Sequence, residues 1–205
     1  MVLLRNLLAL VSKRDRLAQR IYDQCVAAAR APAHYGDGSV ADSVDGRFAM
    51  LTLHLFIAAH RLRGAGPEGE ALVQALVDCF IRDMDCNLRE MGAGDVGVAK
   101  NVKQMALALN GQLHAYERAL VEGPEGLATS LSRNVFAQAD ARGTDSGRTD
   151  EGLDQTAGQS AVRRLTGYTI AQIGHLSAQA DADCVAGRCR MLPVPAAYGE
   201  ERLQP

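Results

Sequence analysis

Apolar residues in this chain recur every three or four positions, and this spacing is the feature that most restricts how the chain can fold. The pattern is clearest between residues 95 and 122, where Val98, Val102, Met105 and Leu109 follow one another at such intervals. This spacing places apolar side chains on one face of an α-helix. No segment shows the strict apolar–polar alternation that is typical of a half-buried β-strand. The sequence therefore predicts an all-α fold.

Glycine, proline and capping residues divide the chain into about six predicted helices. Pro67 suits the first turn of a helix, where its missing N–H costs nothing. Gly92 and the Gly123-Pro124 pair are typical helix stops. Ser12 and Asp45 are predicted as N-terminal caps. The predicted helices span residues 13–31, 46–63, 67–91, 95–122, 127–136 and 159–182.

A single compact helical domain is expected, since 205 residues are enough to bury one substantial core. The helix predicted over 46–63 is apolar almost all round, so we expect it to be central. One stretch lacks large apolar residues apart from Leu153 and is predicted to be flexible. The expected parts are an N-terminal apolar segment (1–12), a core helical domain (13–136), a mobile loop (137–158, clearest near 138–158) and a C-terminal helix and tail on the same domain (159–205).

Residues 1–11 are rich in leucine and valine, with Arg5 among them, and a basic run follows at Lys13, Arg14 and Arg16. A secretory signal carries its charge before its apolar stretch, so we do not expect export. No apolar run reaches the roughly 18 residues that a membrane-spanning helix needs. Two interpretations stay open: a helix packed on the domain, or an interfacial segment that touches anionic lipid.

The net charge of −2 argues against a nucleic-acid-binding surface. The five cysteines are expected to be reduced thiols, because Cys184 and Cys189 lack the second pair that a zinc site would need. Asp83, Cys86 and Glu90 fall on one helical face, but a metal there would require a ligand from elsewhere. We therefore expect no metal site and no cofactor.

Common catalytic patterns are missing from the sequence. His54 and His60 do not form the His-Glu-x-x-His pattern of zinc proteases, and His54 is expected to be a core histidine. Cys25 and His34 have no neighbour that would orient them as nucleophile and base. The sequence therefore predicts a protein that is not an enzyme.

The stretch DMDCNLREMGAGDVGVAKNVKQM, residues 83–105, is charged, contains methionine and is helical on both sides of a Gly-x-Gly break. A short connection of this kind joins antiparallel helices into a hairpin. Flexible methionine side chains among mixed charges suit the capture of an apolar protein segment. The predicted partner-binding residues are Arg82, Asp83, Met84, Asp85, Arg89, Glu90, Met91, Asp95, Lys100, Lys103 and Met105.

Several short sequence blocks together form a recognisable pattern. The blocks are Tyr22-x-x-Cys25-Val26, Ala29-Arg30-x-Pro32, Tyr35, Asp45-Gly46-Arg47-Phe48, Leu53-His54, Asp83-Met84-Asp85, Leu88-Arg89-Glu90-Met91-Gly92-x-Gly94-Asp95, Lys100-x-x-Lys103-x-Met105, Ala115-Tyr116, Arg133-Asn134-Val135, Tyr168, Ala186-Gly187-Arg188 and Pro193. In these blocks the chain resembles the ubiquinol–cytochrome c chaperone family, the cytochrome b and complex III assembly factors of mitochondria and α-proteobacteria, and it looks like the α-proteobacterial type. One departure is Gly111-Gln112, where the family is expected to have Gly-Arg.

The resemblance implies a non-enzymatic chaperone that binds newly made cytochrome b during assembly of ubiquinol–cytochrome c reductase. It also implies contacts with the ribosome, a small co-chaperone and the membrane surface. The expected location is the cytoplasm, at the inner membrane. The alternative from the residues themselves is a helical lipid- or quinone-binding protein, suggested by the leucine-rich start and by the almost wholly apolar second helix.

Overall fold

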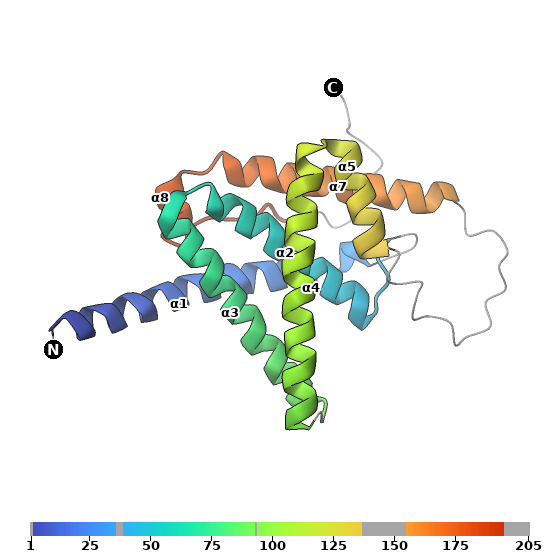
Figure 1. Ribbon diagram of the computed structural model, residues 1–205. Coiled ribbons are helices and arrows are strands. Elements are labelled where there is room, and N and C mark those ends of the chain that lie inside the picture. Colours follow the sequence, from blue (N-terminus) through green and yellow to red (C-terminus); the bar gives the residue numbers. More distant parts are fainter. Residues whose placement is uncertain (1, 36–38, 93, 137–154, 195–205) are drawn as a thin grey trace.

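The fold is organised around one buried helix, α2. The computed structural model describes residues 2–35, 39–92, 94–136 and 155–194, and all regular structure in this part of the chain is helical. Figure 1 shows the elements: α1 (Val2–Ala29), the 3-10 turn η1 (Pro32–His34), α2 (Val44–Arg63), α3 (Gly66–Glu90), α4 (Asp95–Val121), α5 (Pro124–Leu131), the π-helical turn η2 (Ser132–Phe136), α7 (Gln155–Ser177) and α8 (Asp181–Val185).

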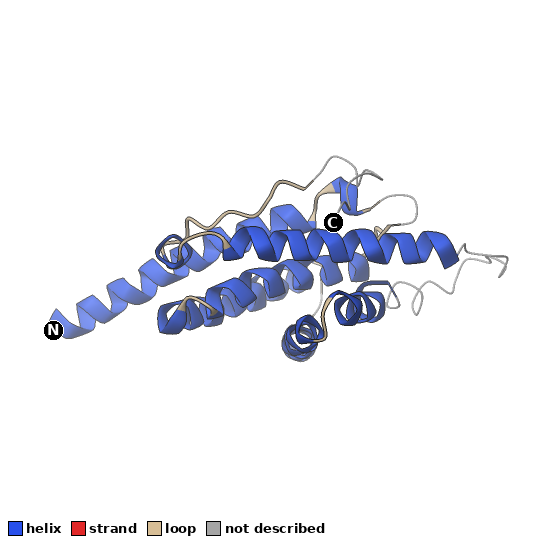
Figure 2. Cartoon of the chain, turned by 90° about the horizontal axis from the view of Figure 1, so that it is seen from above, coloured by secondary structure: helices blue, strands red, loops and turns tan. Residues whose placement is uncertain are grey.

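The predicted all-α architecture is confirmed. α2 is buried along most of its length and contacts α1, α3, α4, α7 and α8, which makes it the central helix that its apolar sequence predicts. α1, α2 and α3 pack on one another, and α7 packs on α2 and α5 (Figures 1 and 2). Among the described residues, no helix is both long and apolar enough to cross a membrane.

Glycines and prolines end and begin the helices where the sequence predicts. Gly66, Gly92 and Gly123 have φ angles of 79°, 82° and 85°, which side chains with a Cβ rarely adopt. Gly66 lets the chain turn from α2 into α3, with Pro67 in the first turn. Gly92 follows the end of α3, and its N–H donates to the Arg89 carbonyl at 2.9 Å. These residues reverse the chain within a few positions.

Two predicted helix starts are wrong. Ser12 lies inside α1, which runs from Val2 to Ala29 without a break, so Ser12 is not its N-cap. The N-cap of α2 is Ser43, whose Oγ accepts a hydrogen bond from the Gly46 N–H at 3.1 Å, and Asp45 lies in the first turn. Serine and aspartate are both favourable near a helix start, so their order along the chain does not decide which one caps.

The C-terminal region differs from the prediction at both ends of its helix. α7 begins at Gln155, so the last residues of the predicted mobile loop are helical. The rest of that loop, residues 137–154, lies outside the described residues. α7 ends at Ser177, and the short helix α8 follows at Asp181.

A small polar cluster lies within the hydrophobic core. His54 is fully buried; its Nδ1 lies 2.7 Å from the Met50 carbonyl oxygen and its Nε2 lies 2.7 Å from the Tyr168 hydroxyl. The His34 ring centroid is 5.4 Å from that of His54. Burial lowers the pKa of His54 to about 3 and that of His34 to about 4. His54 is therefore a satisfied core histidine, as the sequence predicts.

Candidate protein-binding site

The α3–α4 hairpin projects from the body of the molecule (Figure 1), and one arginine joins the two helices at its end. Arg89 on α3 donates to Asp85 on the same helix at 2.7 Å and to Asp95, the first residue of α4, at 2.6 Å. These two carboxylates raise the pKa of the Arg89 guanidinium. The arginine therefore joins the two helices at the turn and keeps their charged ends together.

Two of the predicted partner-binding residues face inward. The Asp83 carboxylate accepts a hydrogen bond from the Tyr22 hydroxyl on α1 at 2.6 Å, so it ties α3 to α1. Burial, and then this hydrogen bond, raise the pKa of Tyr22. Met84 is only 8% exposed and belongs to the core. These two side chains therefore hold α3 against α1 and the core, and they are not part of the exposed surface of the hairpin.

Of the two arginines one helical turn from Asp85 on α3, Arg82 and Arg89, only Arg89 forms an ion pair with it. Arg89 pairs with Asp85, but Arg82 instead places its Nη2 3.1 Å from the Cys79 sulfur. The structure brings the other predicted residues to the outside of the hairpin, except for Asp85 and Met105, which are partly buried. The exposed ones are Arg82, Arg89, Glu90, Met91, Asp95, Lys100 and Lys103.

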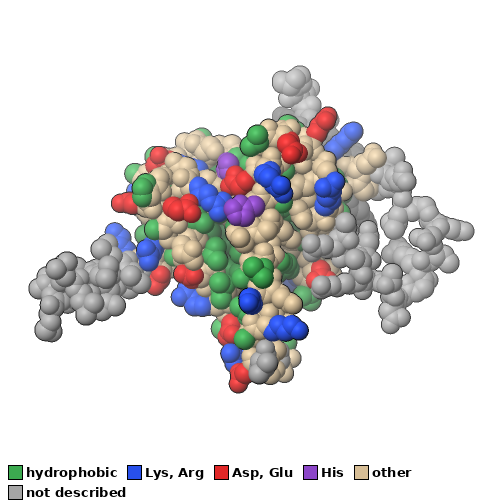
Figure 3. All heavy atoms as spheres, viewed as in Figure 1, with side chains coloured by type: hydrophobic (Ala, Val, Ile, Leu, Met, Phe, Trp, Pro, Cys, Tyr) green, Lys and Arg blue, Asp and Glu red, His purple; other side chains and the backbone are tan. Residues whose placement is uncertain are grey.

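Above the hairpin turn, α3 and α4 diverge and enclose a cleft of about 870 Å³. Figure 3 shows hydrophobic side chains between the two helices, with histidine and charged side chains gathered above them. The apolar residues that line the cleft come from α3 and α4; they are Val73, Val77, Ala106, Leu109 and Leu113. The charged and histidine residues that line it are His60, Arg61, Arg63, Glu70, His114, Glu117 and Asp181.

Glu117 on α4 pairs with two side chains of α2 at the end of the cleft that lies away from the hairpin turn, which we call the wide end. One of its carboxylate oxygens lies 2.9 Å from His60 Nδ1, and the other accepts a hydrogen bond from Arg63 Nη1 at 3.0 Å. Arg63 also lies 3.8 Å from Glu70 of α3. Charges from three helices therefore meet at this end, beside the apolar lining of the cleft.

The sequence predicts partner contacts around the hairpin turn, and none of the residues that line the cleft is among those predicted. A signal for the cleft is present in α3, where Val73 and Val77 form a second apolar row beside the core row of Leu72 and Leu76. A stripe of that width is more than one packing partner needs to cover. The angle between α3 and α4 depends on how the two helices pack against α1 and α2. That angle cannot be predicted from the spacing of residues within α3 or α4.

No group of three or more metal-ligating side chains comes together within the described ranges. Asp83, one member of the single-face set Asp83, Cys86 and Glu90, is engaged with Tyr22. The arrangement is thus a cleft with an apolar lining and charged side chains beside it.

Comparison with known proteins decides the family. The sequence profile of the family described as "Ubiquinol-cytochrome C chaperone" matches residues 37–191. The chain belongs to this family. The matched range contains α2, α3, α4 and α7, so it includes every residue that lines the cleft of this ubiquinol–cytochrome c chaperone family member.

Two relatives of this chaperone family member illustrate the likeness. The solved structure titled "Crystal structure of the Cbp3 homolog from Brucella abortus" is 32% identical, with a TM-score of 0.71, and the match covers 94% of this chain and 97% of that one. The mouse protein "Ubiquinol-cytochrome c reductase complex assembly factor 1" is 23% identical over 121 residues, 59% of this chain. The matched part spans only 41% of the mouse protein.

Proposed function

We propose that this chain is a chaperone that binds newly synthesised cytochrome b while ubiquinol–cytochrome c reductase is assembled, and that it does so without catalysing a reaction. The observation that carries the proposal is the cleft between α3 and α4, with an apolar lining and charged ends, in a member of this chaperone family. Apolar helix segments bind in grooves of this kind through side chains one helical turn apart.

The charged ends of the cleft suit an orienting role. The hairpin end carries Lys100 and Lys103 as exposed cations, and the wide end carries the Glu117 network. Charges at the rim of a binding surface steer a partner and fix its direction more than they add affinity.

Removal of the gene should lower the cellular content of cytochrome b and the quinol–cytochrome c reductase activity together. Reintroducing the wild-type chain should restore both quantities. Within the rescued strain, the wild-type chain should copurify with cytochrome b. Unchanged cytochrome b and unchanged reductase activity in the deletion strain would refute the proposal.

A charge in the cleft lining is expected to prevent client binding without unfolding the protein. Ala106 is partly exposed in the cleft, so Ala106→Glu can reach solvent, but it places a carboxylate where an apolar segment would lie. We expect capture of cytochrome b to fall about tenfold or more, because burying an unpaired charge is costly. Gln104→Glu, on the exposed opposite side of α4, is the matched control and should capture normally. Equal capture by both variants would place the client elsewhere.

Charge reversal at the hairpin should weaken capture in a salt-dependent way. Lys103 is exposed on α4, and we expect Lys103→Glu to lower capture about threefold at low salt, with the difference shrinking at high salt. Lys13→Glu makes the same charge change at an exposed position of α1, and we expect it to leave the capture of cytochrome b unchanged. Both melting temperatures should stay within about 3 °C of the wild type. A large loss of thermal stability in Lys103→Glu would make that residue structural.

A second candidate function, lipid or quinone binding, is favoured by one observation. The cleft volume of about 870 Å³ lies within the range of small-ligand sites, about 300–1,000 Å³. Native mass spectrometry of the purified protein separates the two functions. Bound lipid or quinone would support the alternative, and a ligand-free protein that captures cytochrome b would support the chaperone.

The family resemblance extends the proposal to location and further partners. We infer that the chain acts in the cytoplasm at the inner membrane, contacts the translating ribosome and the membrane surface, and works with a small co-chaperone. Crosslinking in cells that are translating cytochrome b should recover ribosomal proteins and the nascent chain together. Recovery of mature cytochrome b alone would instead place the contact after synthesis.

A further inference from the structure

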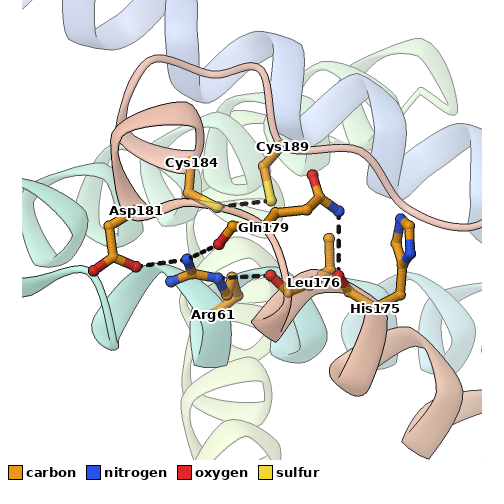
Figure 4. A network of polar contacts seen from close by, with 7 residues as sticks. All are labelled: Arg61, His175, Leu176, Gln179, Asp181, Cys184 and Cys189. Atoms are coloured by element: carbon orange, nitrogen blue, oxygen red, sulfur yellow. Dashed lines mark hydrogen bonds and ion pairs between the residues drawn. The ribbon is translucent and has the colours of Figure 1, made fainter.

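The described part of the chain contains one pair of cysteines whose sulfur atoms face each other. Cys184 lies on α8 with its side chain fully buried, Cys189 follows the turn at Gly187, and their Sγ atoms lie 2.9 Å apart (Figure 4). Both are free thiols. A disulfide bond requires about 2.05 Å between the sulfurs, so less than about 1 Å of approach separates this thiol pair from a bond.

We propose that Cys184 and Cys189 form a reversible disulfide when the protein meets a small-molecule disulfide such as oxidised glutathione. Disulfides of proteins in reducing compartments are mostly transient and redox-sensing. The inference does not depend on the identity of the client. It rests on the distance between the sulfurs, on their unequal exposure and on the structure that holds the two cysteines in place.

The rest of the C-terminal segment is held by the side-chain amides of two glutamines, one on α7 and one in the turn that follows it. Gln179 donates to the Arg190 carbonyl at 2.7 Å and accepts from its N–H at 2.9 Å. Gln172 makes the same pair of bonds with Leu192, both at 2.9 Å. We call residues 188–194 the C-terminal strap. Because each glutamine pairs with both backbone groups of one strap residue, Cys189 is held beside Cys184.

Arg61 links the thiol pair to the wide end of the cleft. Its guanidinium is largely buried and donates to the Leu176 carbonyl at 2.8 Å, the Gln179 carbonyl at 2.6 Å and Asp181 at 2.6 Å (Figure 4). Asp181 is the first residue of α8, the helix that carries Cys184, and it also lines the cleft. A bond between Cys184 and Cys189 would therefore fix the α8 turn that forms this wall of the cleft.

The unequal exposure of the two thiols sets the order of the exchange. Cys189 is partly exposed, whereas Cys184 is fully buried. The Cys189 thiolate attacks the small-molecule disulfide, whose S–S bond breaks and releases one thiol. Cys184 then attacks the Cys189 sulfur of this mixed disulfide and releases the second thiol. Two protein thiols are oxidised, and one external disulfide is reduced to two thiols.

The reaction should be slow at neutral pH and faster in alkali. Burial, and then the neighbouring Cys184 thiol, raise the pKa of Cys189 to about 12, and only the thiolate is a nucleophile. The rate should therefore rise close to tenfold per pH unit. The remaining described cysteines cannot form the same bond. Cys25 is fully buried, and its thiol donates a hydrogen bond to the His54 carbonyl. Cys79 is buried, and its sulfur accepts a hydrogen bond from Arg82. Cys86 is exposed, and no other described thiol lies beside it.

The test treats the full chain with oxidised glutathione at pH 8, alkylates the remaining thiols under denaturing conditions and maps the peptides. We expect a Cys184–Cys189 crosslinked peptide and a rise in the melting temperature of roughly 5 °C, both reversed by dithiothreitol. Cys86→Ala, the matched control, should keep the crosslink and the shift. Cys184→Ala should lose both and carry glutathione on Cys189.

Three outcomes would overturn the proposal. One is alkylation of Cys184 and Cys189 in the treated wild type while Cys86 carries glutathione. Another is a crosslink between Cys189 of two different chains. The third is a crosslinked pair that leaves the melting temperature unchanged, since the bond would then not fix the α8 turn.

Discussion

Replacing Gly69 with alanine is expected to destabilise the protein by at least about 4 kcal/mol. Gly69 lies in the second turn of α3, where α3 crosses the end of α2. A Cβ added there would lie 1.8 Å from the Leu62 carbonyl oxygen and 2.9 Å from its carbonyl carbon. Both atoms belong to the backbone, so no side-chain rotation can relieve the overlap. The central helix and α3 would have to separate, and the core between them would open.

Denaturant unfolding of Gly69→Ala and Gly111→Ala provides the comparison. Gly111 is exposed in the middle of α4, and a Cβ there meets nothing within 4 Å. Alanine favours the helix over glycine by about 1 kcal/mol, so Gly111→Ala should be neutral or stabilising. If the two variants lose similar stability, the close approach of α2 and α3 is not the cause.

Acidification from pH 7 to pH 5 is expected to remove about 4 kcal/mol of stability through two buried histidines. Burial lowers the pKa of His54 to about 3 and that of His34 to about 4. In the unfolded chain both return to about 6.5 and bind protons more readily. The stability that the two neutral histidines contribute is fully present above about pH 6.5 and is lost as the pH falls toward 4. At pH 5 each histidine accounts for about 2 kcal/mol, because the unfolded form has gained a proton that the folded form excludes.

Unfolding free energies measured at half-unit steps between pH 7.5 and 5 test this expectation. His114→Gln serves as the control for replacing a histidine, since His114 is exposed on α4 and lies outside the buried pair. NMR of the folded protein should show no protonation of the His54 and His34 rings down to pH 5. A flat stability profile over this range, or a His54 ring that titrates near pH 6.5, would contradict the prediction.

Much of the secondary structure was predictable because its signals are local. A proline in the first turn of a helix and a glycine with positive φ after its end act within one turn, as at Pro67 and Gly92. The apolar character of α2 likewise predicts its central position, since a helix without a polar face can be stable only when it is covered. The start of α1 was missed because helix propagation through Ser12 competes with capping there, and spacing alone does not tell which prevails.

The candidate site was only partly predictable. The charged side chains of the α3–α4 hairpin are close together in sequence, so their grouping could be expected, and their role in binding stays a prediction. Met84 and Asp83 were assigned to the same surface, but α1 and the core cover that side of α3. Two helices that pack on α3 from different directions leave exposed only a narrow strip, whose position depends on how those helices pack.

The sequence by itself determined the all-α class, most helix limits and the family, because periodicity, turn residues and family motifs are all properties of neighbouring positions. The tertiary structure decided where the cleft opens, that Gly69 touches α2, and that His54 meets Tyr168 across 114 positions of chain. These contacts depend on the angle and distance between helices. Packing of whole helix faces sets both, and no short stretch of sequence contains that information.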